Sequence, residues 1–412
     1  MTSRRLFLKS GAMAMLSLGF APSFVGRAAA AATSRRKLLI AIFQRGAVDG
    51  LNMVVPYGEA SYYALRPSIA IAPPGHAGGA IDLEGFFGLH PAAAPLKPLW
   101  DNGSLAVVHA CGSPAATRSH FDAQDYMESA TPGVKSTRDG WMNRYLQAGT
   151  DPSTSLGASR NPLRGVAVTR QMPRTLQGRA PSLAVGSVEE FRVRGDRHGR
   201  SIESMYANDR LLGSAAADAF EAMRTLRGAT GGVYTPAAGA TYPRSPFGQA
   251  LQEIARIAKA DVGLELGFAE SGNWDHHVNE GGATGQMANR LGDLTQGIAA
   301  LATDLGERMA DTVILTMSEF GRTAAENGNG GTDHGHGNAL FVIGGNVKGG
   351  RVYGRWPGLD EQDRFEGRDL AVTTDFRDVF SEVVAGHLGA SREALARVFP
   401  GHAAGGRLGI IG

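Results

Sequence analysis

The sequence has little cysteine, little net charge and, after its first residues, no long apolar run. Cys111 is the single cysteine among 412 residues, which excludes an intrachain disulfide and a cysteine metal cluster. The formal net charge is +2, and no basic stripe interleaved with aromatic residues occurs, which argues against a nucleic-acid partner. With no disulfide available, we expect a buried core to stabilise the protein, and a chain of this length can supply one.

The first residues have the three features of an export signal. Arg4 and Arg5 open a cationic segment, a weakly apolar stretch runs from Gly11 to Val25, and an alanine tract over 28–32 offers a cleavage site. Paired arginines are typical of the twin-arginine route. The apolar stretch is short for the about 20 residues that a membrane-spanning helix needs. We therefore expect a signal over 1–32, transport by the twin-arginine translocase, a periplasmic location and no membrane span in the mature chain.

Apolar runs alternate with amphipathic stretches, which predicts an α/β fold with a doubly wound, mostly parallel sheet and helices on both faces. Strands are expected at 37–43, 105–109, 262–268, 313–317 and 340–343. Helices are expected at 91–102, 201–227, 247–259, 285–310 and 376–388. Apolar residues recur at three- and four-residue spacing from Met287 to Leu305, which indicates one buried stripe. We expect a single domain over 33–412, in which 150–245 is an insertion or cap.

Polar clusters follow the first two predicted strands, where open α/β sheets place their ligands. Asp49 comes after the first strand and is either a metal ligand or a turn former, since Asp-Gly is a common turn dipeptide. Ser119, or Thr117, follows the second strand and is a candidate nucleophile, with Arg118 as an anion clamp. Capping of a helix by Ser119 is the favoured alternative for this loop.

Two further clusters carry carboxylates and imidazoles. Asp275 and His277 follow a predicted strand and form either a chelating pair or a structural hydrogen-bond cluster. The densest cluster offers four potential ligands within eighteen residues, set among glycines: Glu319, Asp333, His334 and His336. Carboxylate oxygens and imidazole nitrogens bind divalent metals such as zinc, manganese and calcium. Arg322 lies between them and pairs with Glu319 or contacts an anionic ligand.

These motifs occur together and in order along nearly the whole mature chain. They are Arg-Gly-Ala-Val-Asp-Gly-Leu-Asn (45–52), Thr-Arg-Ser-His-Phe-Asp (117–122), Trp-Asp-His-His (274–277), Ser-Glu-Phe-Gly-Arg-Thr (318–323) and Gly-Thr-Asp-His-Gly-His-Gly-Asn (331–338). With the twin-arginine leader, this set resembles the exported bacterial family known as domain of unknown function 1501. That family in turn resembles the alkaline phosphatase and sulfatase superfamily.

The resemblance implies an alkaline-phosphatase-like fold that carries one or two metals at the strand ends and hydrolyses phosphate or sulfate esters. It implies Ser119 as nucleophile, Arg118 and Arg322 as anion clamps, and a pool of metal ligands: Asp49, Asp275, His277, Glu319, Asp333, His334 and His336. Phe320 stands where the superfamily has a histidine, so that ligand is lost unless His334 or His336 replaces it. A non-catalytic periplasmic binding or assembly protein on the same scaffold is the alternative, because a fold does not determine a function.

Overall fold

The computed structural model of the chain describes residues 36–148, 161–187, 221–222, 224–403 and 406–412. The expected export signal, 1–32, lies outside the described residues, as does most of the stretch at 201–227 in which the sequence predicts helices. Within the described residues, no helix is both long and apolar enough to cross a membrane.

A nine-stranded sheet forms the centre of the described structure, and every strand except β10 runs in the same direction. The order across the sheet is β11 (Arg351–Tyr353), β5 (Leu105–Gly112), β10 (Asn338–Gly344), β9 (Thr312–Met317), β1 (Leu38–Gln44), β8 (Leu266–Ser271), β6 (Gly165–Ala167) and β7 (Leu183–Ala184). A short strand, β12 (Thr374–Asp375), also pairs with β5. The predicted mostly parallel sheet is confirmed.

The central strand β1 shows why both faces of this sheet must be covered. Its sequence, Leu-Leu-Ile-Ala-Ile-Phe-Gln, is buried at every position. Successive side chains of a strand point to opposite faces. Accordingly, Leu38, Ile40 and Ile42 pack into one hydrophobic core, whereas the residues between them pack into another. A strand that is apolar on both faces requires a helical layer on each side.

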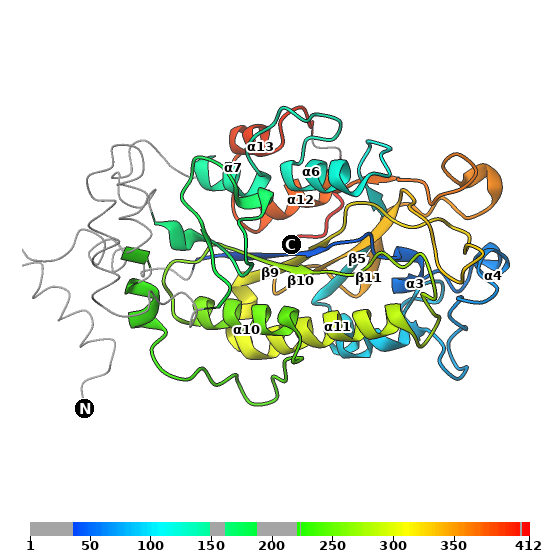
Figure 1. Ribbon diagram of the computed structural model, residues 1–412, viewed down its shortest axis with the longest axis horizontal. Helices are drawn as coiled ribbons and strands as arrows, with labels where there is room; N and C mark the ends of the chain where they lie inside the picture. The colour runs from blue at the N-terminus through cyan, green and yellow to red at the C-terminus, as the bar shows by residue number, and fades with distance from the viewer. Residues whose placement is uncertain (1–35, 149–160, 188–220, 223, 404–405) are drawn as a thin grey trace, which may run out of the picture.

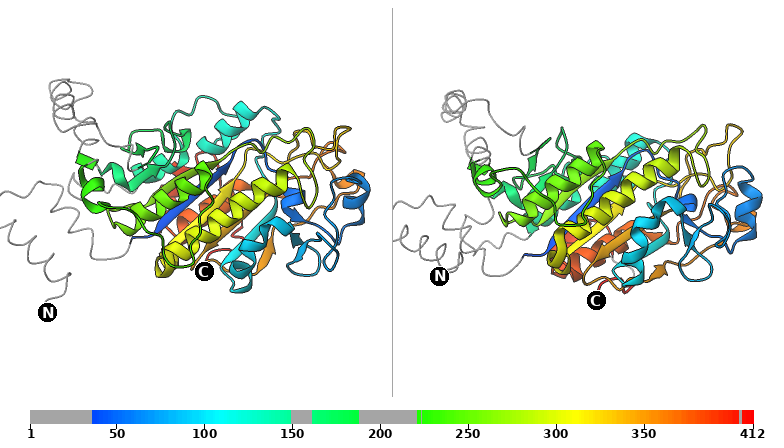
Figure 2. Two further views of the ribbon diagram at one scale, coloured as in Figure 1. Left: turned by 60° about the horizontal axis from the view of Figure 1, so that its bottom comes forward. Right: turned by 90° about the horizontal axis from the view of Figure 1, so that it is seen from below.

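Helices form these two layers (Figure 1). One face is covered by α10 (Pro246–Lys259) and α11 (Gln286–Leu305), which run along the sheet in the views of Figure 2. The other face carries α6 (His120–Ser129), α7 (Trp141–Ala148), α12 (Phe376–Gly386) and α13 (Arg392–Val398). The stripe predicted along α11 is buried from Met287 to Leu305, so its three- and four-residue spacing correctly identified the packed face.

Two predicted boundaries differ from the structure by more than the others. The strand predicted at 262–268 begins only at Leu266, because Asp261 and Gly263 have φ angles of 53° and 93°, which interrupt extended backbone. The helix predicted at 285–310 leaves the α conformation at Leu305, where Gly306 has a φ angle of 52°. A 3-10 turn over Gly306–Asp311 then leads directly into β9.

Shorter elements complete the described fold. A three-stranded sheet of β2 (Val54–Val55), β4 (Gly88–Leu89) and β3 (Ile81–Asp82) is accompanied by α3 (Gly50–Met53), α4 (Ala60–Leu65), a 3-10 helix (Pro91–Leu96) and α5 (Lys97–Asp101). These elements occupy the segment between β1 and β5. The described part of region 150–245 contributes β6 and β7, which extend the central sheet beyond β8.

The reversed strand β10 determines where the polar loops lie. The parallel strands β1, β5, β8 and β9 all end at one edge of the sheet, and β10 begins there because it runs in the opposite direction. The whole connection from Ser318 to Gly337 therefore starts and finishes at this edge. Open α/β sheets bind ligands beyond the carboxyl ends of their parallel strands, so this edge is where a site is expected.

Candidate metal centre

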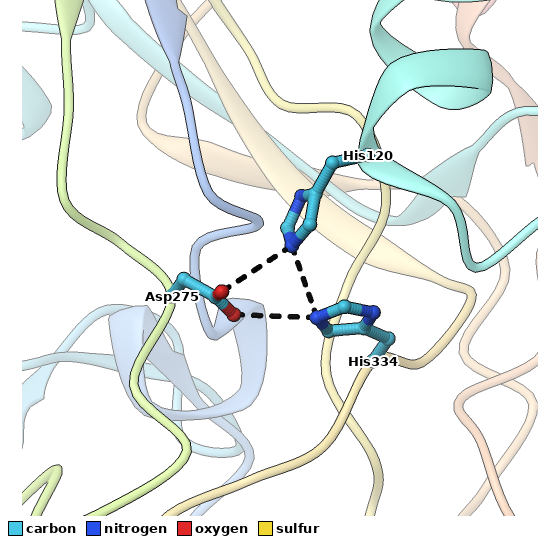
Figure 3. Close-up of side chains that lie close together, drawn as sticks. All are labelled: His120, Asp275 and His334. Atoms are coloured by element: carbon cyan, nitrogen blue, oxygen red, sulfur yellow. Dashed lines mark hydrogen bonds and ion pairs between the residues drawn. The ribbon is translucent and has the colours of Figure 1, made fainter.

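Three histidines and one aspartate converge at this edge from three segments of the chain. His120 begins α6, Asp275 and His277 lie in the loop after β8, and His334 precedes β10. The Nε2 atom of His334 lies 3.0 Å from Nε2 of His120, 3.0 Å from Nε2 of His277 and 3.3 Å from Oδ1 of Asp275. Figure 3 shows His120, Asp275 and His334 pointing toward one another, and their ligand atoms all lie within 4.8 Å.

The outer nitrogen of each histidine faces a group that only accepts hydrogen bonds. The partners are Glu319 Oε1 at 2.8 Å from Nδ1 of His120, the Arg118 carbonyl at 2.9 Å from Nδ1 of His334 and Asp333 Oδ1 at 3.1 Å from Nδ1 of His277. Burial would raise the pKa of Glu319, but hydrogen bonds from His120 and Gln124 lower it on balance, so this carboxylate is ionised. When the ring hydrogens sit on Nδ1, the Nε2 lone pairs of the three histidines face the centre and the Asp275 carboxylate.

In that protonation state the centre contains acceptors and lacks donors between its histidines. The Nε2 atom of His334 then lies 3.0 Å from the Nε2 atoms of both His120 and His277 without a proton between them. A divalent cation would satisfy the Nε2 atoms of His120 and His334 and the Asp275 carboxylate together, and the Nε2 atom of His277 lies 3.0 Å from that of His334. Histidine ligands typically donate their outer N–H to a carboxylate or carbonyl, and each of the three histidines has such a partner here. Three imidazoles and one carboxylate form a ligand set that zinc accepts.

Arg322 holds the loops around this centre in place. Its buried guanidinium donates to Asp275 Oδ1 at 2.6 Å. The remaining hydrogen bonds go to the backbone carbonyls of Gly46, Ala47, Trp274 and Thr332, at 2.5–3.2 Å. Burial would raise the pKa of Asp275, but the hydrogen bond from Arg322 lowers it on balance and keeps the carboxylate ionised. Arg322, predicted as an anion clamp, is therefore engaged as a positioning residue.

Phe320 packs against the centre, whereas His336 lies outside it. The buried Phe320 ring lies 5.0 Å from the His120 ring and 5.1 Å from the His334 ring, so it packs against two ligands. His336 lies outside the centre, where it packs against Phe365 with 4.4 Å between ring centroids, and burial lowers its pKa to about 4.

Asp49, another predicted ligand, is committed to a buried ion pair. Its carboxylate accepts hydrogen bonds from both terminal nitrogens of Arg66 and from the backbone N–H of Leu51, where it caps α3. Burial would raise the pKa of Asp49, but the charge of Arg66 lowers it on balance. Glu280 is buried beside this pair, and its Oε2 accepts a hydrogen bond from Thr332 at 2.8 Å.

Arg118 and Ser119 also have partners within the protein. Nη2 of Arg118 lies 2.6 Å from Asp369 Oδ2 and 2.7 Å from Glu366 Oε2, so its charge is paired. Ser119 is the N-cap of α6, and its Oγ accepts from Asp122 N at 3.5 Å, as the capping interpretation predicts. The chain segment nevertheless contributes to the centre through the Arg118 carbonyl and through His120.

Sequence reasoning missed His120 as a ligand. His120 belongs to the Thr-Arg-Ser-His-Phe-Asp motif, which predicts a helix cap or a nucleophile at Ser119, and it is not among the ligands predicted from the sequence. A usable signal was its position, because a histidine directly after an N-cap lies at the start of a helix, next to the carboxyl edge of the preceding strand. Of the predicted pool, Asp275, His277 and His334 meet at the centre, whereas Glu319 and Asp333 stand behind its histidines.

A cleft of about 810 Å³ opens at the same edge of the sheet. Its lining includes Arg45 after β1, Glu270 near the end of β8, and Arg170 and Arg174 after β6. Nη1 of Arg45 donates to Gln124 at 2.9 Å, and Gln124 donates to Glu319 at 2.9 Å. The cleft is therefore linked by hydrogen bonds to the carboxylate that orients His120.

The sequence matches a family model described as a protein of unknown function, DUF1501, over residues 103–394. The chain belongs to the DUF1501 family. The four converging residues all fall within the matched segment, whereas Asp49 precedes it. Among solved structures, the DUF1501 chain is similar to the PsFucS1 sulfatase from Pseudoalteromonas sp., with 12% identity, a TM-score of 0.38, and coverage of 95% of this chain and 73% of that one. No curated protein matches the sequence significantly.

Asp49→Asn is expected to destabilise the DUF1501 chain by about 3–5 kcal/mol, because it leaves the buried Arg66 charge unpaired. Metal binding should be retained. Urea unfolding measures the free energy of unfolding, and elemental analysis measures the metal. Asp101→Asn, which removes the exposed partner of Lys97, is the control and should cost at most about 0.5 kcal/mol. Unchanged stability with loss of metal would instead identify Asp49 as a ligand.

Glu280→Gln is expected to stabilise the protein at neutral pH and to have less effect near pH 4. Burial and the negative charge of Asp49 raise the pKa of Glu280 well above its usual range, so the folded state retains a proton that the unfolded chain releases above about pH 4.3. The wild type therefore loses stability as the pH rises from there toward the folded-state pKa, and the glutamine variant avoids this loss. The urea midpoints of the wild type and of Glu280→Gln at pH 4.5 and pH 7.5 test this prediction. An equal difference between the two midpoints at both pH values would contradict it.

Glu319→Gln is expected to weaken metal binding by about 10–100-fold while the fold is retained, because the charge that orients His120 is lost. Competition with a chromophoric chelator measures the zinc dissociation constant. Glu270→Gln removes a carboxylate at the same edge that pairs with Arg45, and it should leave that constant unchanged. Equal effects of the two substitutions would mean that the net charge of the edge, rather than the contact with His120, determines affinity.

Proposed function

We propose that this protein is an exported, metal-dependent hydrolase of phosphate or sulfate esters. The observation that carries the proposal is the set of three imidazole Nε2 atoms around the Asp275 carboxylate, each ring having its Nδ1 beside a hydrogen-bond acceptor. The ester chemistry comes from the family's resemblance to phosphatases and sulfatases. Export through the twin-arginine translocase to the periplasm follows from the sequence of residues 1–32.

The residues fit a bound divalent metal, with His120, His277, His334 and Asp275 as its ligands. When bound there, such a metal lowers the pKa of a water or hydroxyl group and stabilises charge on a phosphoryl or sulfuryl group. Zinc suits three nitrogens best, since calcium prefers oxygen ligands. The side chains of Asp275 and His277 remain 44% and 40% exposed, so an ester can reach the centre from solvent.

The surroundings also suit an anionic substrate. Three arginines and one glutamate line the adjoining cleft, so its formal charge is positive, although Arg45 and Arg174 pair with carboxylates. Arginine side chains bind phosphate and sulfate groups well because their N–H groups form a planar fork. Ser119 lies one residue before His120 and is the side-chain nucleophile that we propose, with water as the alternative.

One observation favours a second function, a metal-binding protein without turnover. The guanidinium groups of Arg118 and Arg322, the two predicted anion clamps, both bond to protein groups. An enzyme that transfers a phosphoryl group needs cationic groups aimed at the developing charge. If these arginines stay engaged, the centre would serve binding or assembly in the periplasm rather than hydrolysis.

The protein purified after export is expected to contain about one metal per chain, and an Asp275→Ala/His334→Ala variant is expected to contain none, because two residues of the His120, Asp275 and His334 group are removed. Elemental analysis of both measures this. His76→Ala, which removes an exposed histidine outside the centre, is the matched control and should retain the metal. A folded wild type without metal would contradict the proposal and leave the cluster as a hydrogen-bond network.

The metal-loaded protein is expected to hydrolyse members of a panel of aryl phosphate and sulfate esters, and a chelator should abolish this activity. Product release measured across pH 5–9 provides the test. Ser119→Ala separates the two nucleophiles, since loss of activity with metal retained identifies the hydroxyl, and retained activity identifies water. A protein that binds metal and hydrolyses no ester at any pH would support the non-catalytic function instead.

A further inference from the structure

Gln124 binds the same carboxylate oxygen as His120, one turn further along α6. The two residues are four positions apart on this helix, so their side chains share one of its faces. The side-chain nitrogen Nε2 of Gln124 donates to Glu319 Oε1 at 2.9 Å, and Nδ1 of His120 lies 2.8 Å from that oxygen. Two groups from consecutive turns of α6 therefore hold a single oxygen atom.

The partners of Gln124 fix which way round its amide stands. A guanidinium only donates hydrogen bonds, and an ionised carboxylate only accepts them. Nη1 of Arg45 donates to the amide oxygen at 2.9 Å, so this oxygen faces Arg45 and the amide NH2 group faces Glu319. Arg45 is held in turn by Glu128 and Glu270, whose Oε1 atoms lie 3.0 and 2.7 Å from its Nη2. The amide therefore cannot reverse without losing both of its hydrogen bonds.

Glu319 is a junction between three segments of the chain. Its side chain is fully buried, and its Oε1 also accepts a hydrogen bond from the backbone N–H of Gly46 at 2.8 Å. Ala123, the neighbour of Gln124 on α6, packs with Phe320 in a small apolar cluster. The loop after β1, the first turns of α6 and the residues after β9 thus meet around one carboxylate.

A single hydrogen bond to this carboxylate would not place a metal ligand accurately. Hydrogen bonds tolerate a spread of about 0.5 Å in length, whereas the distance from a metal to its ligand tolerates only about 0.2 Å. Held by its own bond alone, His120 could move with the first turn of α6 by more than a metal allows. The second bond, from Gln124 to the same oxygen, restricts rotation of that turn.

We propose that Gln124 is a positioning residue of the metal centre, which acts through Glu319 to keep Nε2 of His120 directed at the bound metal. The inference rests on the proposed function and extends it to a residue outside the ligand set. A purely structural bond would affect the stability of the protein and leave the geometry at the metal unchanged. The two roles can therefore be separated by measurement.

Gln124→Met removes both amide bonds and keeps an unbranched side chain that favours a helix equally well. In the full-length protein, competition with a chromophoric chelator is expected to show zinc binding weakened by about three- to tenfold, less than for Glu319→Gln because Glu319 still contacts His120. The visible absorption spectrum of the cobalt-substituted protein, which reports the geometry of the ligands, is expected to change as well.

Gln147→Met is the matched control. Gln147 is a half-buried glutamine of α7, and its Nε2 donates to Asp139 Oδ2 at 2.9 Å and to Asn143 Oδ1 at 2.8 Å. This variant should lower the urea midpoint about as much as Gln124→Met does, since each loses hydrogen bonds of a helical glutamine. It should leave the zinc dissociation constant and the cobalt spectrum unchanged. Equal losses of zinc affinity in the two variants would reduce the role of Gln124 to general stability.

A double variant tests whether Gln124 acts through Glu319. Gln124→Met/Glu319→Gln is expected to bind zinc as Glu319→Gln does, within about twofold, because the carboxylate that Gln124 positions is already gone. Losses that multiply would overturn this route. A wild type that binds zinc, matched by Gln124→Met in affinity and spectrum, would overturn the positioning role and leave the metal-dependent function standing. A wild type that binds no zinc would overturn both.

Discussion

The buried guanidinium of Arg322 is the constraint on which the candidate site depends. It bonds to carbonyls in the loops after β1 and β8 and in the loop before β10, and to the carboxylate of Asp275. A buried charge without partners is very costly, so the three loops must keep these oxygens turned inward whenever the protein is folded. This arrangement fixes the direction of Asp275 and brings His334 to the centre. A residue that lies behind the centre therefore determines where the side chains of the centre lie.

The loops can approach Arg322 so closely because glycine occupies the contact points. A Cβ atom at Gly46, whose φ angle is 114°, would lie 2.7 Å from the backbone nitrogen of Asp275. A Cβ atom at Gly335 would lie 2.3 Å from the carbonyl carbon of Arg322. Both distances are far inside van der Waals contact. Glycine is therefore required at these two positions on steric grounds. Its small size allows the segments that carry the side chains of the centre to pack closely.

Much of the fold was predictable from the sequence, because strands buried on both faces are continuously apolar and α11 has a regular apolar stripe. The reversal of β10 was not, since a strand that is apolar on both faces reads the same in either direction. Asp275, His277 and His334 could be predicted because they follow or precede strands at one edge. The sequence could not show which side chains face the centre and which stand behind them, because spacing along the chain does not determine the direction of a side chain. The ion pair of Asp49 likewise needs Arg66, which no pattern in the sequence links to it.

Phe320 explains why the centre is single and open. Its ring is buried against Ala47 and Ala123, so an imidazole there would lie deep in an apolar cluster. The imidazoles of His120 and His334 lie farther out than this phenyl ring and pack against its surface. The described residues hold no second centre, since Asp49 is paired with Arg66 and His336 packs against Phe365. The centre is therefore half-exposed and lies over an aromatic base, the buried ring of Phe320.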